Sequence, residues 1–418
     1  MRPSTAFAAA AIWLAWPAGP VPAQQAQGPC APDNAGLTLP QGFCARIVAE
    51  SVGAVRHLVV APNGDVFAAV RSGQNRPGAV LALRDANRDG MLEIAGRFGP
   101  GGGSGIALAN GYLYFALDDA VVRWRWADGQ LEPAGPPDTV VSGLLSRRQH
   151  AAKTIAVSAD GGLYVNIGAP SNACQVQDRQ AGSPGRDPCT LLDSAGGIWR
   201  FDANRPGQRQ ADGTRFSTGL RNVVALTWDP VGRALYGAQH GRDQLNTFWP
   251  ALYDSLQNAE KPAEELYRLE QGGDYGWPYC FYDPELRQKI LQPEYGGDGR
   301  TVGRCATVRQ PLVTFPAHWA PNAVLVYRGT RFPAEYRGGF FVAFHGSWNR
   351  APLPQQGFNV AFVPMSGEAP GQWRVFADGF QAPGRSARPT GLAVGPEGSL
   401  YVSDDTSGRI FRISYRGN

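Results

Sequence analysis

The chain has 418 residues, of which 43% are hydrophobic and 18% are charged, and its formal net charge is +4. This mild balance, without any basic run, argues against a nucleic-acid-binding protein. The 53 glycines and 34 prolines follow no short period, which argues against a collagen, and the 11 tryptophans, 14 tyrosines and 19 phenylalanines require a packed interior rather than a disordered chain. The composition therefore predicts a large, turn-rich, all-β globular protein.

The N-terminus has the pattern of a secretory signal peptide. Arg2 supplies a positive charge, residues 6–16 form an apolar run, and prolines break that run before the small-residue sequence Val-Pro-Ala at 21–23. We expect a signal peptide over 1–23, an N-terminal segment over 24–39, and a periplasmic or secreted protein. The alternative, a buried N-terminal helix, is disfavoured by the prolines. The run is too short to span a membrane, and no later stretch is apolar enough to do so.

All six cysteines follow the expected cleavage site, which agrees with export to an oxidising compartment. Six cysteines allow many pairings. Their spacing forms three local couples and so favours the disulfides Cys30–Cys44, Cys174–Cys189 and Cys280–Cys305. No cysteine belongs to a CxxC zinc motif or a CxxCH haem-attachment motif, so a c-type haem is not expected.

One phrase recurs along the chain: a glycine-containing turn followed by a short strand of alternating aromatic and aliphatic residues. Its copies begin near residues 61, 108, 158, 229, 336 and 395. Six copies at irregular spacing predict an all-β fold over residues 40–416, a six-bladed β-propeller of four-stranded antiparallel sheets. We expect the last strand to close against the first blade and the longest insertion, 243–310, to overhang one face. A β-sandwich or two β domains are the alternative.

Scarce titratable residues in loops are the first candidates for chemistry. The chain has only five histidines and three lysines. His150, His240 and His345 occupy ends of expected strands, where a propeller lines its central funnel. Arg221 and Asn222 stand side by side before a strand and suit a planar carboxylate or quinone, because arginine presents a fork of donors. On local evidence alone, a surface arginine beside a turn-forming asparagine is the favoured alternative.

Several familiar motifs are absent or incomplete. The sequence contains no GxSxG, Walker A, GxGxxG or HExxH pattern, which argues against serine hydrolases, NTPases, Rossmann dehydrogenases and zincins. Residues 85–90 begin like an EF-hand loop, but position twelve is Gly96 and no helices are expected around it. A β-hairpin turn is therefore the favoured interpretation of this segment.

Taken together, these segments resemble the soluble PQQ (pyrroloquinoline quinone)-dependent sugar dehydrogenases, in particular the sorbosone or aldose dehydrogenase branch. The motifs that carry the resemblance are Leu-Arg-Asn at 220–222, His-Gly-Arg-Asp-Gln-Leu at 240–245, Gly-Gly-Asp-Tyr-Gly-Trp-Pro at 272–278, Phe-His-Gly-Ser-Trp-Asn-Arg at 344–350 and the closing phrase 391–405. They span nearly the whole mature chain in the expected order. The family's fold is a six-bladed propeller, as the repeats predict.

The resemblance implies a role for individual residues. His150 matches the general base, which takes the proton of the sugar hydroxyl. Bound Ca²⁺ would act as a Lewis acid on the PQQ cofactor. Cofactor contacts are implied for Arg221, Asn222 and Arg388, calcium ligation by backbone carbonyls for Gly241 and Arg242, and a second, structural calcium site for Glu265 and Tyr275.

Three positions depart from the family pattern. Gln149 precedes the base where the best-known members have aspartate. No lysine follows Lys289, although those members place a cofactor-contacting lysine in the fifth blade; His345 and Arg350 are the candidates for that contact. Arg242 replaces a residue of another type, which ligation through a backbone carbonyl tolerates.

The leading hypothesis is a periplasmic PQQ- and Ca²⁺-dependent oxidoreductase. It would oxidise an aldose or related sugar, at the anomeric hydroxyl to a lactone or acid, and pass electrons to an external acceptor. Two alternatives stay open: a secreted propeller that binds carbohydrate or protein without catalysis, and a calcium-dependent lactonase.

Overall fold

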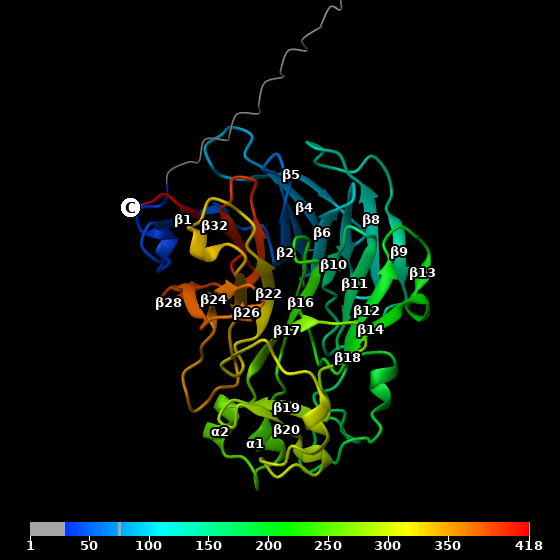
Figure 1. Ribbon diagram of the computed structural model, residues 1–418. Coiled ribbons are helices and arrows are strands. Elements are labelled where there is room, and N and C mark those ends of the chain that lie inside the picture. The colour runs from blue at the N-terminus through cyan, green and yellow to red at the C-terminus, as the bar shows by residue number, and fades with distance from the viewer. Residues whose placement is uncertain (1–29, 74–76, 418) are drawn as a thin grey trace, which may run out of the picture.

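The computed structural model of the chain describes residues 30–73 and 77–417. Within these residues the structure is almost entirely β, and the α-helices are the short α1 (Leu245–Phe248) and α2 (Ser255–Glu260). Six sheets of four or five strands follow one another along the described chain (Figure 1). Their first strands contact one another in a closed cycle, β2 to β6, β10, β15, β22, β30 and back to β2. This ring confirms the predicted six-bladed β-propeller.

Each blade begins with its inner strand at the axis. The four main strands of blades one to three are β2 (Val55–Val60), β3 (Val66–Val70), β4 (Ala79–Arg84), β5 (Glu93–Phe98); β6 (Gly105–Ala109), β7 (Tyr112–Ala116), β8 (Ala120–Arg125), β9 (Asp138–Ser142); and β10 (Ile155–Val157), β11 (Gly162–Ile167), β12 (Gly197–Asp202), β14 (Thr214–Thr218). Those of blades four to six are β15 (Ala225–Asp229), β16 (Ala234–Gln239), β17 (Glu264–Leu269), β21 (Val313–Phe315); β22 (Pro321–Val326), β23 (Phe340–His345), β24 (Phe358–Val363), β27 (Arg374–Ala377); and β30 (Pro389–Val394), β31 (Leu400–Asp404), β32 (Arg409–Tyr415), β1 (Phe43–Ala49).

Shorter strands decorate this frame. They are β13 (Gln208–Arg209), β18 (Gly273–Asp274), β19 (Cys280–Asp283), β20 (Gln288–Leu291), β25 (Met365–Ser366), β26 (Ala369–Pro370), β28 (Gln381–Ala382) and β29 (Arg385–Ser386). The recurring phrase has the same place in all six blades: it forms the turn between the first and second strands and the start of the second strand. The glycine-containing turns therefore predicted the inner hairpin of each blade.

The ring closes differently from the sequence-based expectation. The last strand does not join the first blade; instead the first strand, β1, forms the outer edge of the sixth blade. It pairs antiparallel with β32, from Phe43 opposite Tyr415 onward. This exchange ties the two ends of the chain into one sheet, so β32 does not remain an unpaired edge strand.

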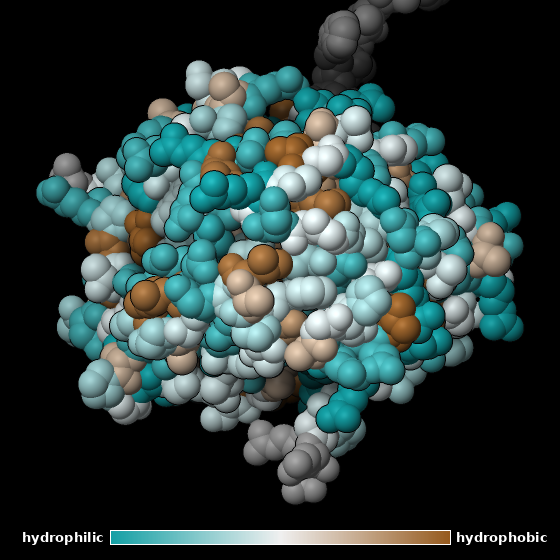
Figure 2. Space-filling view, turned by 90° about the horizontal axis from the view of Figure 1, so that it is seen from below, coloured by the Kyte–Doolittle hydropathy of each residue, from teal (hydrophilic) through white to brown (hydrophobic). Residues whose placement is uncertain are grey.

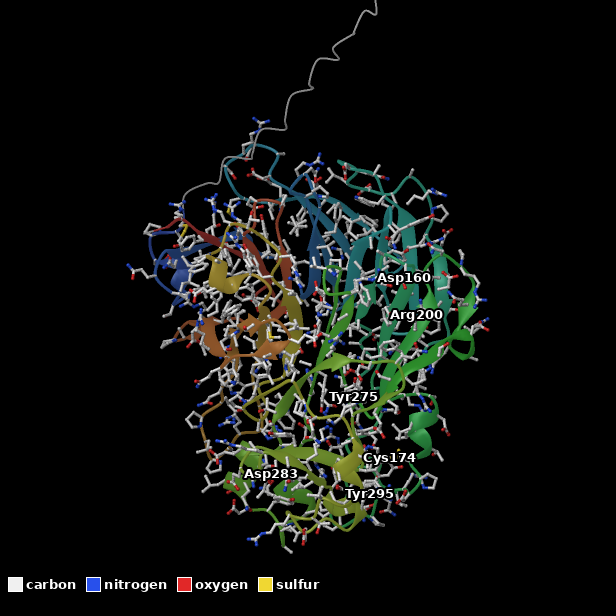
Figure 3. The ribbon with its side chains drawn as sticks, viewed as in Figure 1. Asp160, Cys174, Arg200, Tyr275, Asp283 and Tyr295 are labelled. Carbon is white, nitrogen blue, oxygen red and sulfur yellow. A yellow bond between two sulfur atoms is a disulfide. The ribbon has the colours of Figure 1, made fainter. Side chains whose placement is uncertain are left out.

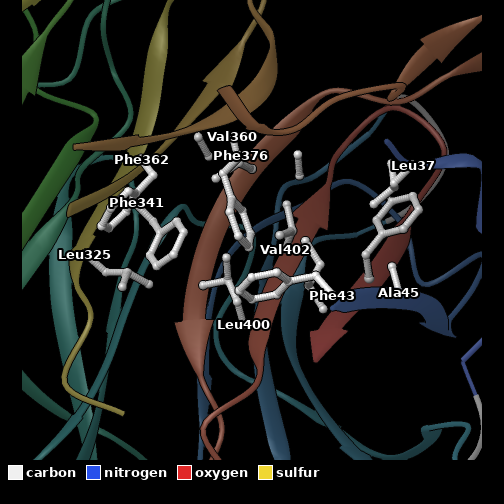
Figure 4. Close-up of a cluster of buried hydrophobic side chains, with 14 of the residues drawn as sticks. Leu37, Phe43, Ala45, Leu325, Phe341, Val360, Phe362, Phe376, Leu400 and Val402 are labelled. Carbon is white, nitrogen blue, oxygen red and sulfur yellow. The ribbon is translucent and has the colours of Figure 1, made fainter. Parts of the chain in front are cut away.

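The core lies between the blades, because each sheet buries both faces against its neighbours. Hydrophobic clusters occupy each of the six interfaces within the described chain. The largest joins blades five and six, where Phe341 and Phe362 meet Leu400 and Val402 (Figure 4). Phe43 of β1 packs edge-on against neighbouring rings of the same cluster. Alternating aromatic and aliphatic residues therefore hold adjacent blades together.

The predicted insertion lies between β16 and β21. Its helices α1 and α2 and its hairpin β19–β20 gather beyond one end of the blades, at the bottom of Figure 1. Seen from that end, hydrophobic residues form small separate patches in a mostly hydrophilic surface (Figure 2). The structure forms the three favoured disulfides, Cys30–Cys44, Cys174–Cys189 and Cys280–Cys305. The last of these closes a loop within the insertion.

Two further expectations concern segments outside the blades' core. The predicted signal peptide, 1–23, lies outside the described residues. The segment 85–90 forms the turn between β4 and β5, where the Gly90 amide donates to the Asp85 carboxylate over 2.9 Å. No helix among the described residues is long and apolar enough to cross a membrane.

Candidate active site

The insertion end of the propeller is where chemically active side chains converge. Inner strands begin at this end and second strands finish at it, so the loops before β10, β15 and β22 meet those after β16 and β23. They enclose a cavity of about 160 Å³. Its lining residues are His150, Arg221, His240, Gly241, Asp243, Glu264, His318, Ala320, Trp348 and Asn349.

The His150 ring is held in one tautomer. Its Nδ1 lies 2.6 Å from the Ala169 carbonyl oxygen, which only accepts, so Nδ1 carries the proton and Nε2 keeps a free lone pair. Burial, followed by the nearby Arg221 guanidinium, lowers the pKa of His150 from 6.5 to about 3. The imidazole is therefore neutral at ordinary pH and bears a proton acceptor beside the cavity.

Neighbouring residues accept hydrogen bonds from almost all of the N–H groups of the Arg221 guanidinium. Its Nε and one Nη2 hydrogen donate to the carbonyl and side-chain oxygens of Asn172, and Nη1 donates to the Gly241 carbonyl over 2.8 Å. The second Nη2 hydrogen donates to Asp243 over 2.8 Å. Four of the five N–H groups are thus used by described residues, and one on Nη1 is left for a ligand.

One buried and one partly buried carboxyl group, those of Glu264 and Asp243, flank this cation. Burial alone would raise the pKa of Asp243, but Arg221 and Arg179 lower it to about 2. Burial raises the pKa of Glu264 to about 8, although its oxygens accept the amides of Gly241 at 2.8 Å and Ala320 at 3.1 Å. The site therefore holds one firmly ionised carboxylate and one that ionises with difficulty.

The cavity wall also contains strained backbone. His150, His318 and Ala320 have positive φ angles of 52°, 66° and 57°. Non-glycine residues rarely adopt this left-handed conformation, which costs on the order of 1–3 kcal/mol each. Three such residues therefore lie around this one small cavity.

Two of the other predicted cofactor residues form a polar chain at the same end of the blades. Arg388 Nη1 lies 3.3 Å from His345 Nδ1, and His345 Nε2 lies 2.9 Å from the Asp405 carboxylate. Arg56 binds the second oxygen of Asp405 at 2.5 Å. Asn222 is buried beside the cavity wall, where its Oδ1 accepts from Asn166 over 3.2 Å. Arg388, His345 and Asn222 thus all have hydrogen-bond partners, but none of the three lines the cavity.

The side chains of four other predicted residues lie outside the cavity; for Arg242 the predicted ligand is the backbone carbonyl, and for Glu265 and Tyr275 it is a separate site. Arg350 Nη1 donates to the carbonyls of Ala259 and Ala317, away from the cavity. The Arg242 side chain turns into the insertion and pairs with Glu294 at 2.5 Å. Glu265 and Tyr275 lie together, but both contact the Lys289 ammonium.

Sequence reasoning missed several residues of the cavity. Asp243, Trp348 and Asn349 lie within motifs already recognised, so membership in those motifs was their available signal. His318 is one of the scarce histidines. Glu264 gave no signal of its own: successive residues of a strand face opposite sides, so only the register of β17 separates it from Glu265.

Larger hollows occur elsewhere. One of about 280 Å³ follows the propeller axis between the inner strands and is lined mainly by aliphatic residues, with His57 among them. It has no cation–carboxylate pair among its lining residues. The described residues also contain no cluster of three or more histidine, cysteine, aspartate or glutamate side chains arranged for a metal ion. The lining residues therefore favour the smaller cavity, around His150 and Arg221, as the candidate active site.

Comparison with known proteins agrees with the motif-based resemblance. A family model described as TrAA12-like matches residues 37–416. The chain is 26% identical over 332 residues to the pyrroloquinoline quinone-dependent pyranose dehydrogenase of Coprinopsis cinerea, which covers 70% of this chain and 43% of that protein. It is 24% identical over 337 residues to the pyrroloquinoline quinone-dependent sugar dehydrogenase of Hypocrea jecorina, which covers 74% of this chain and 73% of that protein.

Solved structures share the fold. The holo form of the Coprinopsis cinerea pyranose dehydrogenase PQQ domain has a TM-score of 0.72 at 20% identity, and the match covers 90% of this chain and 97% of that domain. The calcium structure of a Trichoderma reesei family AA12 enzyme has the same TM-score at 19% identity, with 94% and 99% covered. The chain spans less than half the length of the Coprinopsis protein and of an uncharacterized Borreliella burgdorferi relative, at 43% and 48%.

Proposed function

The chain belongs to the TrAA12-like family, and from that premise we propose that it is a PQQ-dependent sugar dehydrogenase that uses Ca²⁺. The observation that carries the proposal is the cavity in which a neutral, tautomerically fixed His150 lies with the nearly saturated Arg221. The relatives named for pyranose and sugar oxidation support the substrate class.

The residues around the cavity fit an anionic quinone held with a calcium ion. Arg221 keeps one N–H for an anionic oxygen, and the Gly241 carbonyl, already bonded once, keeps a second lone pair. The side-chain oxygen of Asn349 is buried and has no hydrogen-bond partner. With the carboxylate of Asp243 it completes a set of oxygen donors, the kind that Ca²⁺ prefers.

The roles of the chain's own groups follow from this geometry. When bound, PQQ supplies a two-electron acceptor and Ca²⁺ supplies Lewis-acid polarisation. His150 accepts the proton of the substrate hydroxyl at Nε2, while the Ala169 carbonyl keeps the ring oriented. Asp243 holds the Arg221 guanidinium in place. Arg388 and His345 form a polar wall beyond the cavity, where they can contact a ligand larger than the cavity itself.

The sugar is expected to enter over Trp348. This residue lines the cavity yet is 63% exposed, so a ligand that enters from solvent can contact it. Indole rings combine a large apolar face with a polar edge, which suits a pyranose. The product is a lactone or the corresponding acid, and an external acceptor takes up the electrons. The disulfides support a periplasmic or secreted location.

Reconstitution tests this function. The purified chain is stripped with chelator, titrated with PQQ with and without Ca²⁺ while absorbance is followed, and then assayed by dye reduction with a panel of aldoses. We expect calcium-dependent PQQ binding and sugar-dependent dye reduction. Sugar binding without any PQQ binding would instead establish a non-catalytic carbohydrate-binding propeller.

A further inference from the structure

A buried lysine lies where the propeller meets its insertion. Lys289 belongs to β20 of the insertion, and its side chain has no exposed surface. Its ammonium donates to the backbone carbonyl of Tyr275 and lies 3.2 Å from Glu265 Oε1 on β17. The Tyr267 ring, whose centroid is 5.1 Å away, adds a cation–π contact. Figure 3 shows Tyr275 at this junction, between the blades and the insertion.

These contacts occupy the two residues for which the family resemblance implies a structural calcium ion. A carboxylate and a backbone carbonyl are suitable calcium ligands, but here both already face one ammonium group. A divalent cation at the same point would meet the positive charge of Lys289 in a site without solvent screening. Glu265 and Tyr275 therefore do not fit a metal ion while Lys289 is present.

We infer that the Lys289 ammonium is a built-in replacement for the second, structural calcium ion, so that this junction is held by the chain itself and needs no metal. This inference goes beyond the proposed function, because it concerns a position outside the cavity and is independent of the cofactor.

The ammonium supports the candidate site through two further groups. Glu265 accepts with its other oxygen from the Gln239 side-chain amide. Gln239 in turn accepts from the backbone amide of Arg221 over 3.0 Å. A continuous chain thus runs from Lys289 through Glu265 and Gln239 to Arg221. An internal cation at its far end keeps the Glu265 carboxylate in place whether or not calcium is available.

Removal of the ammonium should convert the position into a calcium site. In the chelator-treated chain without PQQ, Lys289→Ala is expected to lower Tm by about 5 °C or more, because it leaves a buried carboxylate unpaired. Millimolar Ca²⁺ should restore at least half of that loss, and equilibrium dialysis should show one more bound Ca²⁺ per chain than in the wild type. The double variant Lys289→Ala/Glu265→Gln should show neither the restoration of Tm by Ca²⁺ nor the additional bound Ca²⁺. A single variant that folds but gains no calcium would overturn the inference.

A second measurement decides the matter if Lys289→Ala does not fold. Wild-type crystals grown in about 10 mM CaCl₂, roughly ten times the dissociation constant of the weakest calcium sites, are examined for anomalous density between Glu265 and Tyr275. Lysine density without an anomalous peak supports the inference, and a calcium peak at that point overturns it. Neither experiment depends on PQQ binding, so failure of the proposed function and failure of this inference are distinguishable.

Discussion

At His150 a single carbonyl decides the chemistry of the ring. Because Nδ1–H donates to the Ala169 carbonyl oxygen, the lone pair stands on Nε2, and burial keeps the ring uncharged. Gln149, where familiar members of the family carry aspartate, instead accepts from Arg179 and donates to Asp178. Among the described residues no carboxylate hydrogen-bonds the imidazole, so the proposed base would work beside a cation.

His150→Gln is expected to lower kcat by about 10²–10⁴-fold, because glutamine preserves polarity but offers no basic nitrogen. PQQ binding, followed by absorbance, should persist. The matched control is His57→Gln, since His57 is also partly buried, has a pKa lowered by desolvation to about 4, and hydrogen-bonds a carbonyl, that of Asn322. Equal losses of kcat in both variants would assign His150 a structural role only.

Substitution of Trp348 should change the affinity for substrate without lowering the stability of the fold. Its exposure predicts that Trp348→Ala leaves Tm unchanged, while loss of ring contact raises KM by about 2–10-fold with little change in kcat. Leu256→Ala, at an exposed residue of α2 outside the cavity, is the control. A fall in kcat at constant KM would contradict a role in substrate binding.

At the scale of elements, the insertion between β16 and β21 does most to shape the site. Strand β17 begins within it. Two adjacent acidic residues of this strand point to opposite sides: Glu264 lines the cavity, and Glu265 pairs with Lys289. Gly241 and Asp243 lie on the same loop as Arg242. The ion pair of Arg242 with Glu294 attaches this loop to the insertion. The loop's position therefore depends on how firmly the insertion is folded.

The Cys280–Cys305 disulfide should stabilise this element. It closes a loop of sequence separation 25, for which loss of the cross-link costs about 2–4 kcal/mol. Cys280→Ser/Cys305→Ser is expected to lower Tm and to speed proteolysis within 243–310 before the blades unfold. The double variant Cys30→Ser/Cys44→Ser, at the N-terminal edge, should leave that segment protected. Similar cleavage patterns in both variants would count against local stabilisation.

At the scale of the whole molecule, closure by β1 makes every blade depend on its neighbours. Buried or partly buried histidines lie at the axis and at the cavity, and desolvation lowers the pKa of His240 to about 4 and that of His318 below its usual value. They are uncharged in the folded protein, but in the unfolded chain each takes up a proton near pH 6.5.

The metal-free protein should accordingly lose stability in mild acid. Four histidines, His57, His150, His240 and His318, bind protons more tightly when unfolded. Their contribution is complete above pH 6.5 and is lost as pH falls, through about 4 for His57 and His240 and about 3 for His150. The raised pKa of Glu264 has the opposite effect, because this carboxyl binds its proton more tightly in the folded protein, but it is one group against four histidines. Calorimetry should show a Tm that is constant near pH 7 and lower by roughly 10 °C at pH 4.5. His57→Gln should reduce that slope, whereas a flat profile would contradict the neutral state of these rings.

The sequence by itself determined the propeller, its six inner hairpins, the three disulfides and the motifs around His150, Arg221 and Gly241. These are local signals, because turn glycines, strand alternation and short cysteine spacings act within a few residues. Only the tertiary structure decided that β1 completes the last blade, that Glu264 rather than Glu265 reaches the cavity, and that Lys289 lies against Glu265 and Tyr275. Those outcomes depend on pairings between distant segments and on which face of a strand meets which neighbour, and no local pattern contains either.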